Sequence, residues 1–319
     1  MARKVLSATM KYLISIAVSG SPHHIEIDEA RYRLIADARA SLFEALFLEE
    51  KLDLVTENYY EYETELLSMA SRMMCFHDDD YFSLSRERNL VSRRVVNLLT
   101  AGRMYLDQSA QHFDNIYGAD SNNATRLRAE FASQHKASLG YRAMNALRNY
   151  VQHRGFPIQS VRFPQQRIEK GDDILLLHRV VPLMTIVALE DDGKFKASVL
   201  EELRAIQRDG YVDIRPLIRG YVEAIGKIHE KARELIGLDL KSWEQTLDDT
   251  VAFSKNEVGA AASSGGVAII AERDDRTWEE RIPIFKEFIQ RRQALERKNC
   301  LFFNLRTSYA SNEIRPDDT

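Results

Sequence analysis

The first half of the chain places polar and apolar residues with the period of an α-helix. The segment from Asp28 to Met74 contains no glycine or proline, and Asp28 followed by Glu29 is a favourable helix start. Apolar residues recur there at intervals of three and four positions: Leu34, Ile35, Ala38, Leu42, Leu46 and Phe47. This pattern predicts two amphipathic helices that turn near residues 51–56.

Two more helices are predicted before residue 157. One extends over about residues 83–117 and ends at the turn residues that begin with Gly118. The next runs from about Ala124 to His153 and is stopped by Gly155 and Pro157. We therefore expect residues 1–157 to form an antiparallel helical bundle.

The pattern changes after Pro157. Residues 158–163 and 174–189 are rich in Val, Ile, Leu and Thr, and glycine- and aspartate-containing turns bound them, which predicts strands. The later signals are helices at about 197–207 and 214–235, a loop at 259–266, and a capping-box pattern at Thr277–Glu280 before a last helix. The expected fold is mainly α, with a smaller α+β region over residues 158–319.

The charge of the chain is close to balanced, with 44 Lys and Arg against 48 Asp and Glu and a formal net charge of −4. This balance excludes nucleic-acid binding through bulk charge, but it does not exclude a local basic patch. Between Glu130 and Glu169 the chain has no acidic residue and six basic ones: Lys136, Arg142, Arg148, Arg154, Arg162 and Arg167. This window predicts a phosphate-bearing partner, since arginine suits phosphate oxygens. The alternative is a basic helix face that pairs with the acidic first helices.

Candidate chemistry is concentrated in Arg148-Asn-Tyr-Val-Gln-His153, at the end of the predicted fourth helix. Asn149 and His153 share a helix face, whereas Arg148 and His153 are about 140° apart on an ideal helix. They can converge on one ligand only if the helix end distorts or if two chains meet. A histidine in the last turn of a helix, next to arginines, suits general acid–base chemistry near neutral pH.

This segment resembles the Arg-x4-6-His signature of the HEPN superfamily, small helical bundles that often act as metal-independent endoribonucleases. Asn149, directly after the arginine, is also typical of that family, and the resemblance covers about residues 28–157. It implies that the RNA 2′-hydroxyl is the nucleophile, that His153 moves the proton, and that Arg148 stabilises the phosphorane. Asn149 would orient the histidine or the phosphate.

The resemblance further implies an RNA partner, no metal and no cofactor. A homodimer is expected because Arg148 and His153 do not share a helix face, and a two-fold axis would combine two copies into one pocket. The expected RNA-binding residues are Lys136, Arg142, Arg154 and Arg162. A toxin or phage-defence role, with an inhibitor or sensor as a further partner, is common in that superfamily. The alternative function is a non-catalytic scaffold that binds RNA, a nucleotide or an acidic protein.

Other candidate sites are weaker. His23 and His24 predict a solvated loop rather than a metal site, because adjacent residues of an extended chain point to opposite sides. The run from His77 to Asp80 is either a polar loop or an oxygen-rich cation site. The glycines at 259, 265 and 266 lack the Lys-Ser/Thr of a P-loop.

Cellular location is predicted from cysteines and apolar runs. Cys75 and Cys300 are far apart in the sequence, which favours a reducing compartment and two buried or half-buried thiols. Lys11 interrupts the apolar N-terminal stretch, so it is a poor signal peptide. No run of about eighteen apolar residues occurs, so we expect no membrane span and a cytoplasmic protein.

Overall fold

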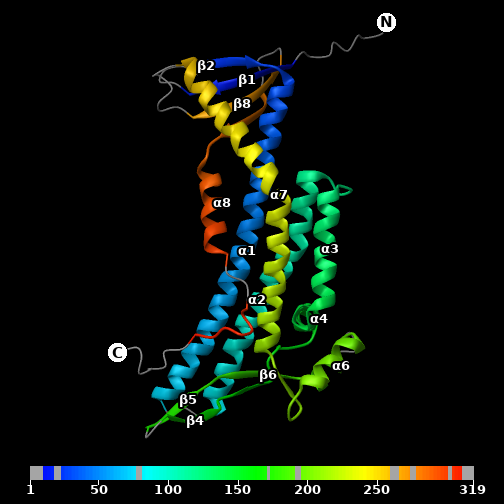
Figure 1. The fold of residues 1–319 in the computed structure, drawn as a ribbon, viewed down its shortest axis with the longest axis vertical. Helices are drawn as coiled ribbons and strands as arrows, with labels where there is room; N and C mark the ends of the chain where they lie inside the picture. Colours follow the sequence, from blue (N-terminus) through cyan, green and yellow to red (C-terminus); the bar gives the residue numbers. More distant parts are fainter. Residues whose placement is uncertain are drawn as a thin grey trace. The chain divides into compact units, whose positions relative to one another are not determined.

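The computed structural model describes residues 10–17, 23–76, 81–170, 173–190, 195–258, 266–273, 278–300 and 304–310 (Figure 1). The protein is mainly α-helical, which confirms the predicted fold class. The helices are α1 (Glu29–Cys75), α2 (Tyr81–Tyr117), α3 (Asn122–Ala137), α4 (Leu139–His153), α5 (Ile186–Glu190), α6 (Ala197–Ile206), α7 (Arg215–Val258) and α8 (Glu287–Lys298). The strands are β1 (Met10–Ile16), β2 (His23–Ile27), β3 (Ser160–Arg162), β4 (Gln165–Lys170), β5 (Asp173–His178), β6 (Val181–Thr185), β7 (Tyr211–Asp213), β8 (Val267–Arg273) and β9 (Trp278–Ile284). None of the described helices combines the length and apolar character needed to cross a membrane.

The chain divides into two compact units, each assembled from separated segments of the sequence. Unit 1 contains Met1–Glu50, Gln111–Ala124 and Arg233–Lys298, and unit 2 contains Lys51–Ala110, Thr125–Ala232 and Asn299–Thr319. Helices α1, α2, α3 and α7 therefore contribute residues to both units. This division differs from the expected boundary at residue 157, because the first strand of the chain pairs with β8 rather than with a neighbour in sequence.

Unit 1 contains an antiparallel sheet in the order β2-β1-β8-β9. Strands β1 and β2 lie in the N-terminal part for which only helices were expected, so that expectation is corrected here. β1 is a central strand whose residues pair with β2 on one side and β8 on the other. The apolar residues of β1 therefore belong to a buried strand. The pairing of β1 depends on β8, which lies far along the chain.

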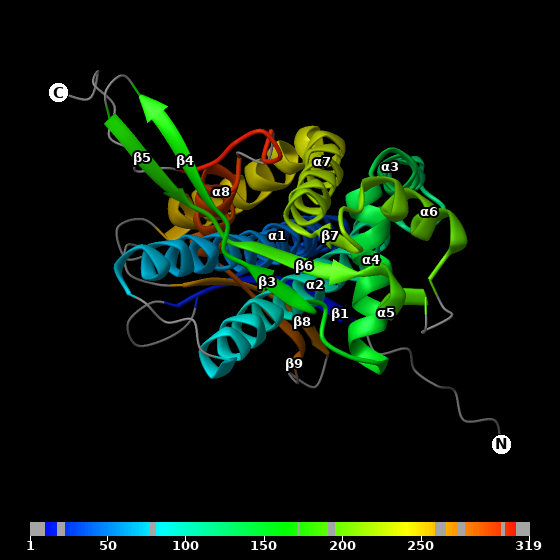
Figure 2. The same cartoon turned by 90° about the horizontal axis from the view of Figure 1, so that it is seen from below.

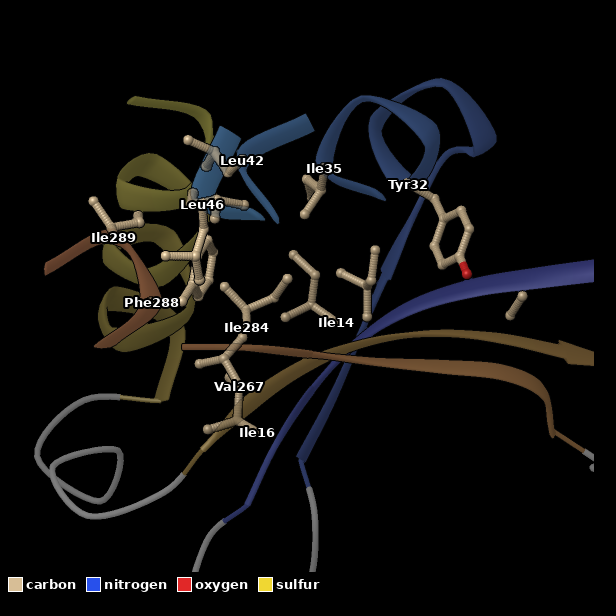
Figure 3. Packing of buried hydrophobic residues seen from close by; sticks show 13 residues of the cluster. Ile14, Ile16, Tyr32, Ile35, Leu42, Leu46, Val267, Ile284, Phe288 and Ile289 are labelled. Atoms are coloured by element: carbon tan, nitrogen blue, oxygen red, sulfur yellow. The ribbon is translucent and has the colours of Figure 1, made fainter. Parts of the chain in front are cut away.

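The core of unit 1 lies between one face of this sheet and helices α1, α7 and α8 (Figure 3). Ile14 of β1 lies opposite Ile269 of β8, and both side chains are fully buried. Phe43 of α1 stacks on Phe288 of α8 with ring centroids 4.3 Å apart. Apolar burial of this kind contributes about 25 cal/mol per Å², so the sheet and the helices stabilise each other.

Helix α1 is continuous from Glu29 to Cys75, so the predicted turn at residues 51–56 is wrong. Leu52 and Val55 are fully buried and extend the apolar stripe through the expected turn. The predicted fourth helix, by contrast, is two helices, α3 and α4. Ser138 separates them, and its hydroxyl accepts a hydrogen bond from the Tyr141 backbone N–H at 3.1 Å, as an N-cap does.

Three details of the second half also differ from expectation. The segment that resembled a capping box belongs to strand β9 from Trp278 onward, because β9 completes the sheet of unit 1 beside β8. Residues 186–189, expected in a strand, form the short helix α5. Helix α7 continues from the predicted end at residue 235 to Val258. The loop expected at 259–266 lies, apart from Gly266, outside the described residues.

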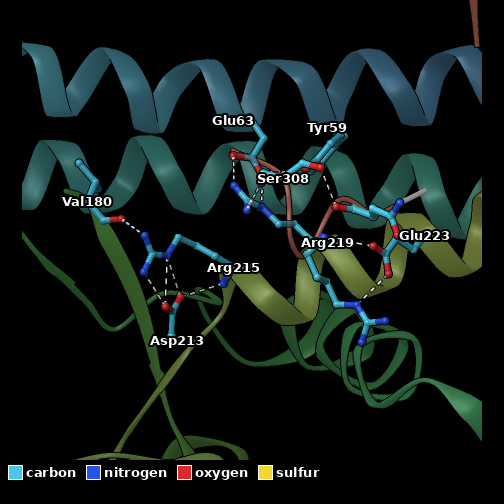
Figure 4. A network of polar contacts seen from close by, with 10 residues as sticks. Tyr59, Glu63, Val180, Asp213, Arg215, Arg219, Glu223 and Ser308 are labelled. Carbon is cyan, nitrogen blue, oxygen red and sulfur yellow. Dashed lines mark hydrogen bonds and ion pairs between the residues drawn. The ribbon is translucent and has the colours of Figure 1, made fainter. Parts of the chain in front are cut away.

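Unit 2 contains helices, a three-stranded sheet in the order β3-β6-β7 and the β4–β5 hairpin, and ion pairs and hydrogen bonds join several of its elements (Figure 4). Arg219 of α7 donates two hydrogen bonds to the Glu63 carboxylate of α1, at 2.8 and 2.9 Å. Arg219 also donates to the Ser308 backbone carbonyl, and Arg306 donates to Glu223 at 2.8 Å. The first turns of α7 thus bind both α1 and the segment around residues 304–310.

Candidate functional site at the end of helix α4

Helix α4 is fixed in unit 2 by its close packing on α7. Its buried side consists of Gly140, Tyr141, Ala143, Met144, Leu147 and Tyr150. A Cβ atom at Gly140 would lie 2.4 Å from the Leu217 backbone oxygen of α7, so only glycine fits at this contact. The position of α4, and of the motif at its end, therefore depends on this backbone approach.

Arg148 lies at the border between the interior of unit 2 and its surface. The side chain is half-buried, and its Nη1 donates to Oδ1 of Asn149 at 3.3 Å. Its Nε is buried and has no hydrogen-bond partner in the described part of the chain. Burial raises the pKa of Tyr221 on α7, and the positive charges of Arg103 and Arg148 oppose that rise. Arg148 therefore adds positive charge to the surroundings of the Tyr221 phenol.

His153 is exposed in the last turn of α4, away from the buried side of the helix. The helix is regular up to this point, since the Arg154 backbone N–H donates to the Tyr150 carbonyl at 2.9 Å. No hydrogen bond or ion pair of His153 is found among the described residues. Because the helix end does not distort, Arg148 and His153 keep their angular separation of about 140°. One chain alone does not bring the two side chains together.

Asn149 is exposed and contacts Arg148 rather than His153. The expectation that Asn149 orients the histidine is therefore not met within one chain. Its amide instead holds one end of the guanidinium, and at 3.3 Å the bond is long for an N–H···O contact.

Arg142 was expected to bind RNA, and the structure gives its donors other partners. Nη1 donates to the backbone carbonyls of His135 and Lys136, both at 2.7 Å, at the end of α3. Nη2 donates to both carboxylate oxygens of Glu202 on α6, at 2.6 and 2.9 Å. Arg142 thus joins α3, α4 and α6, and we do not include it in the RNA-facing set.

The Arg142→Ala variant is expected to be less stable by about 1–3 kcal/mol, because charge-assisted hydrogen bonds to partly buried partners are lost. Arg142→Lys should recover little of that loss, since lysine lacks the planar fork that serves three partners. Thermal or urea denaturation followed by circular dichroism measures both variants. An Arg142→Ala protein of unchanged stability would contradict the structural role.

The other basic residues of the window are more accessible. Lys136 and Arg154 are exposed. The Arg162 guanidinium lies over the Tyr211 ring at 4.9 Å and 3.9 Å from an Asp209 carboxylate oxygen. All three side chains therefore lie at the surface of unit 2.

The weaker candidates gain no support. His23 and His24 are exposed, but they belong to strand β2 rather than to the expected loop. No group of three or more potential metal ligands occurs in the described residues, and the run from His77 to Asp80 lies outside them. Cys75 and Cys300 are both exposed, which corrects the expectation of buried or half-buried thiols.

Sequence reasoning missed an open hollow of about 680 Å³ on the N-terminal half of α2. Its lining residues are Phe82, Ser85, Arg86, Asn89, Leu90 and Arg93. Their spacing of three and four positions is the signal that could have revealed one helix face. None of Arg148, Asn149 and His153 lines this hollow.

Comparisons with protein-family models, curated proteins and solved structures found no match. The resemblance to the HEPN superfamily thus rests on the motif in this chain and on its place at the end of α4.

Proposed function

We propose that the protein is a metal-independent endoribonuclease whose active site is completed by two copies of the chain. The observation that carries the proposal is the arrangement of the last two turns of α4. There Arg148 is half-buried and donates to Asn149, while His153 is exposed on another side of the same helix. Two α4 ends related by a two-fold axis would bring Arg148 of one copy to His153 of the other.

The reaction uses a nucleophile that the substrate itself supplies. The 2′-oxygen of a ribose attacks the adjacent phosphorus, and the bond from phosphorus to the 5′-oxygen breaks. His153 accepts the 2′-hydroxyl proton or supplies the proton that the leaving 5′-oxygen requires. Arg148 stabilises the extra negative charge on the phosphorane oxygens. The products carry a 2′,3′-cyclic phosphate and a 5′-hydroxyl.

The accessible basic residues Lys136, Arg154 and Arg162 support substrate binding around this centre. Each contact to a phosphate would release a counterion, so affinity should fall as salt concentration rises. Replacement of these residues should weaken binding more than it slows bond cleavage, because they do not touch the reacting phosphate.

Purified wild-type protein is expected to cleave total cellular RNA equally well with and without EDTA. The fragments should end in a 2′,3′-cyclic phosphate, and DNA of the same sequence should stay intact because it lacks the 2′-hydroxyl. Gel electrophoresis with end-group analysis measures all of these outcomes. Loss of cleavage in EDTA would exclude the metal-independent mechanism.

A protein that binds RNA without cleaving it under any condition tried would favour the second function, a non-catalytic scaffold. The half-buried position of Arg148, whose Nε is buried, is the observation that favours this alternative. In that case binding would survive the loss of His153 and weaken when several arginines are removed.

A further inference from the structure

Helix α2, seen in Figure 2, carries the open hollow on one face of its N-terminal half. Four of the lining residues are four, three and four positions apart, so they form one row along the helix: Phe82, Arg86, Asn89 and Arg93. The row extends over about 16 Å, because each residue of an α-helix adds about 1.5 Å. Glu87, by contrast, lies 3.8 Å from Arg72 of α1. The row and this contact with α1 are therefore on different sides of α2.

The row carries positive charge. Arg93 is exposed and forms no hydrogen bond or ion pair within the described part of the chain. The Arg86 side chain is 61% exposed, and its contact with the Glu87 carboxylate is long, at 3.4 Å. Arg94, one position further, differs because it pairs with two glutamates of α1. No residue that lines the hollow is acidic, so an anion is the counterpart that suits Arg86 and Arg93.

The row also carries an aromatic ring that is open to solvent. Phe82 is 83% exposed, and Asn89 is an exposed amide between Phe82 and Arg93. A ring on which a base can stack, next to cations that bind the backbone, is the combination by which proteins bind single-stranded nucleic acid. A membrane-binding helix instead has a wide apolar face, whereas this row combines one ring with polar and charged side chains. The row therefore suits a nucleic-acid strand better than a lipid surface.

We propose that this row binds single-stranded RNA, with Arg86 and Arg93 on phosphate oxygens and Phe82 stacked on a base. The surface deepens the proposed function, and the choice of RNA rests on that function. None of Arg148, Asn149 and His153 lines the hollow. The row therefore contributes affinity for the substrate rather than bond cleavage.

Binding is measured with a fluorescein-labelled oligouridylate that carries 2′-O-methyl groups. This probe lacks the nucleophilic hydroxyl, so it stays intact whether or not the protein cleaves RNA. Fluorescence anisotropy over a series of salt concentrations gives the dissociation constant and its salt dependence. Arg86→Ala/Arg93→Ala is expected to weaken binding at least about ten-fold. It should also reduce the slope of log affinity against log salt by about 1.4, since each phosphate contact on a single strand contributes about 0.7.

Phe82→Ala is expected to give a different signature. Loss of one stacked base should weaken binding by about five-fold to 100-fold. The salt slope should stay unchanged, because stacking releases no counterion. The control for the arginine variant is Arg33→Ala/Arg291→Ala, which removes the same charge from exposed arginines of unit 1 and should bind like the wild type. Circular dichroism checks that every variant keeps its helices.

The surface and the proposed function can fail separately in this experiment. Equal affinity of the arginine variant and its control, in a protein that cleaves RNA, would overturn the surface and leave the function standing. The expected losses of affinity in a protein that cleaves no RNA would support the surface and count against the function. A wild type that does not bind the probe, or that binds only vesicles of anionic phospholipid, would overturn the surface.

Discussion

His153→Ala and Arg148→Ala are each expected to reduce RNA cleavage by two to four orders of magnitude. Loss of a general acid–base group costs about 10²–10⁴-fold, and loss of a donor that stabilises a developing charge costs about 10²–10³-fold. His153 is exposed at a helix end, so its truncation leaves no cavity, and the thermal midpoint should stay unchanged. Arg148→Lys should recover only part of the activity, because lysine keeps the charge and loses the fork.

A mixture of the two inactive variants separates a composite site from a site within one chain. In a mixed dimer, one of the two sites receives an intact Arg148 and an intact His153. Random exchange of subunits gives half mixed dimers, so about a quarter of wild-type activity should return. Gln152→Ala, at an exposed position next to His153, is the matched control and should keep full activity. A mixture that stays inactive, beside an active wild type, would contradict the composite site.

Gly140→Ala is expected to destabilise the protein by about 1–3 kcal/mol, the range found when side chains are forced into packed interiors. The added Cβ would lie 2.4 Å from the Leu217 backbone oxygen and 3.0 Å from the Tyr221 nitrogen. Backbone atoms cannot move aside as a flexible side chain does, so α4 must shift from α7. Because Arg148 and His153 lie on α4, the same shift should lower RNA cleavage.

Gly237→Ala provides the matched control for this substitution. Gly237 also lies inside a helix, α7, and no atom lies within 4 Å of a Cβ built there. Alanine favours a helix over glycine by about 0.8–1 kcal/mol, so this variant should be more stable than the wild type. Urea denaturation of both proteins gives the two changes in free energy of unfolding. Equal changes in the two variants would show that the α4–α7 contact is not close.

The long helices could be predicted because their apolar residues repeat with helical spacing within one segment. The pattern failed where the decisive partner is distant in sequence. Strand β1 is stabilised by β8, far along the chain, so this pairing leaves no local signal, whereas β9 is the next strand after β8 in the sequence. The predicted turn in α1 failed for a related reason, since Leu52 and Val55 are buried by tertiary packing.

For the candidate site, too, the sequence predicted what depends on residue order within one helix and missed what depends on packing between helices. The order of Arg148, Asn149 and His153 in the sequence already gave their angular separation on α4. The burial of Arg148 Nε could not be foreseen, because it depends on the tertiary packing of α4. Arg142 was assigned to RNA from charge alone, and its actual partner Glu202 lies on another helix.

The pairing of β1 with β8 has a consequence for synthesis of the protein. Met10 of β1 lies opposite Arg273 of β8, so β1 cannot complete its sheet until β8 has also left the ribosome. At roughly 5–20 residues per second, this delay is on the order of tens of seconds. During that time the apolar strand β1 is exposed and open to chaperones or to aggregation. Most of unit 2 precedes β8 in the sequence, so it can begin to pack before β1 pairs with β8.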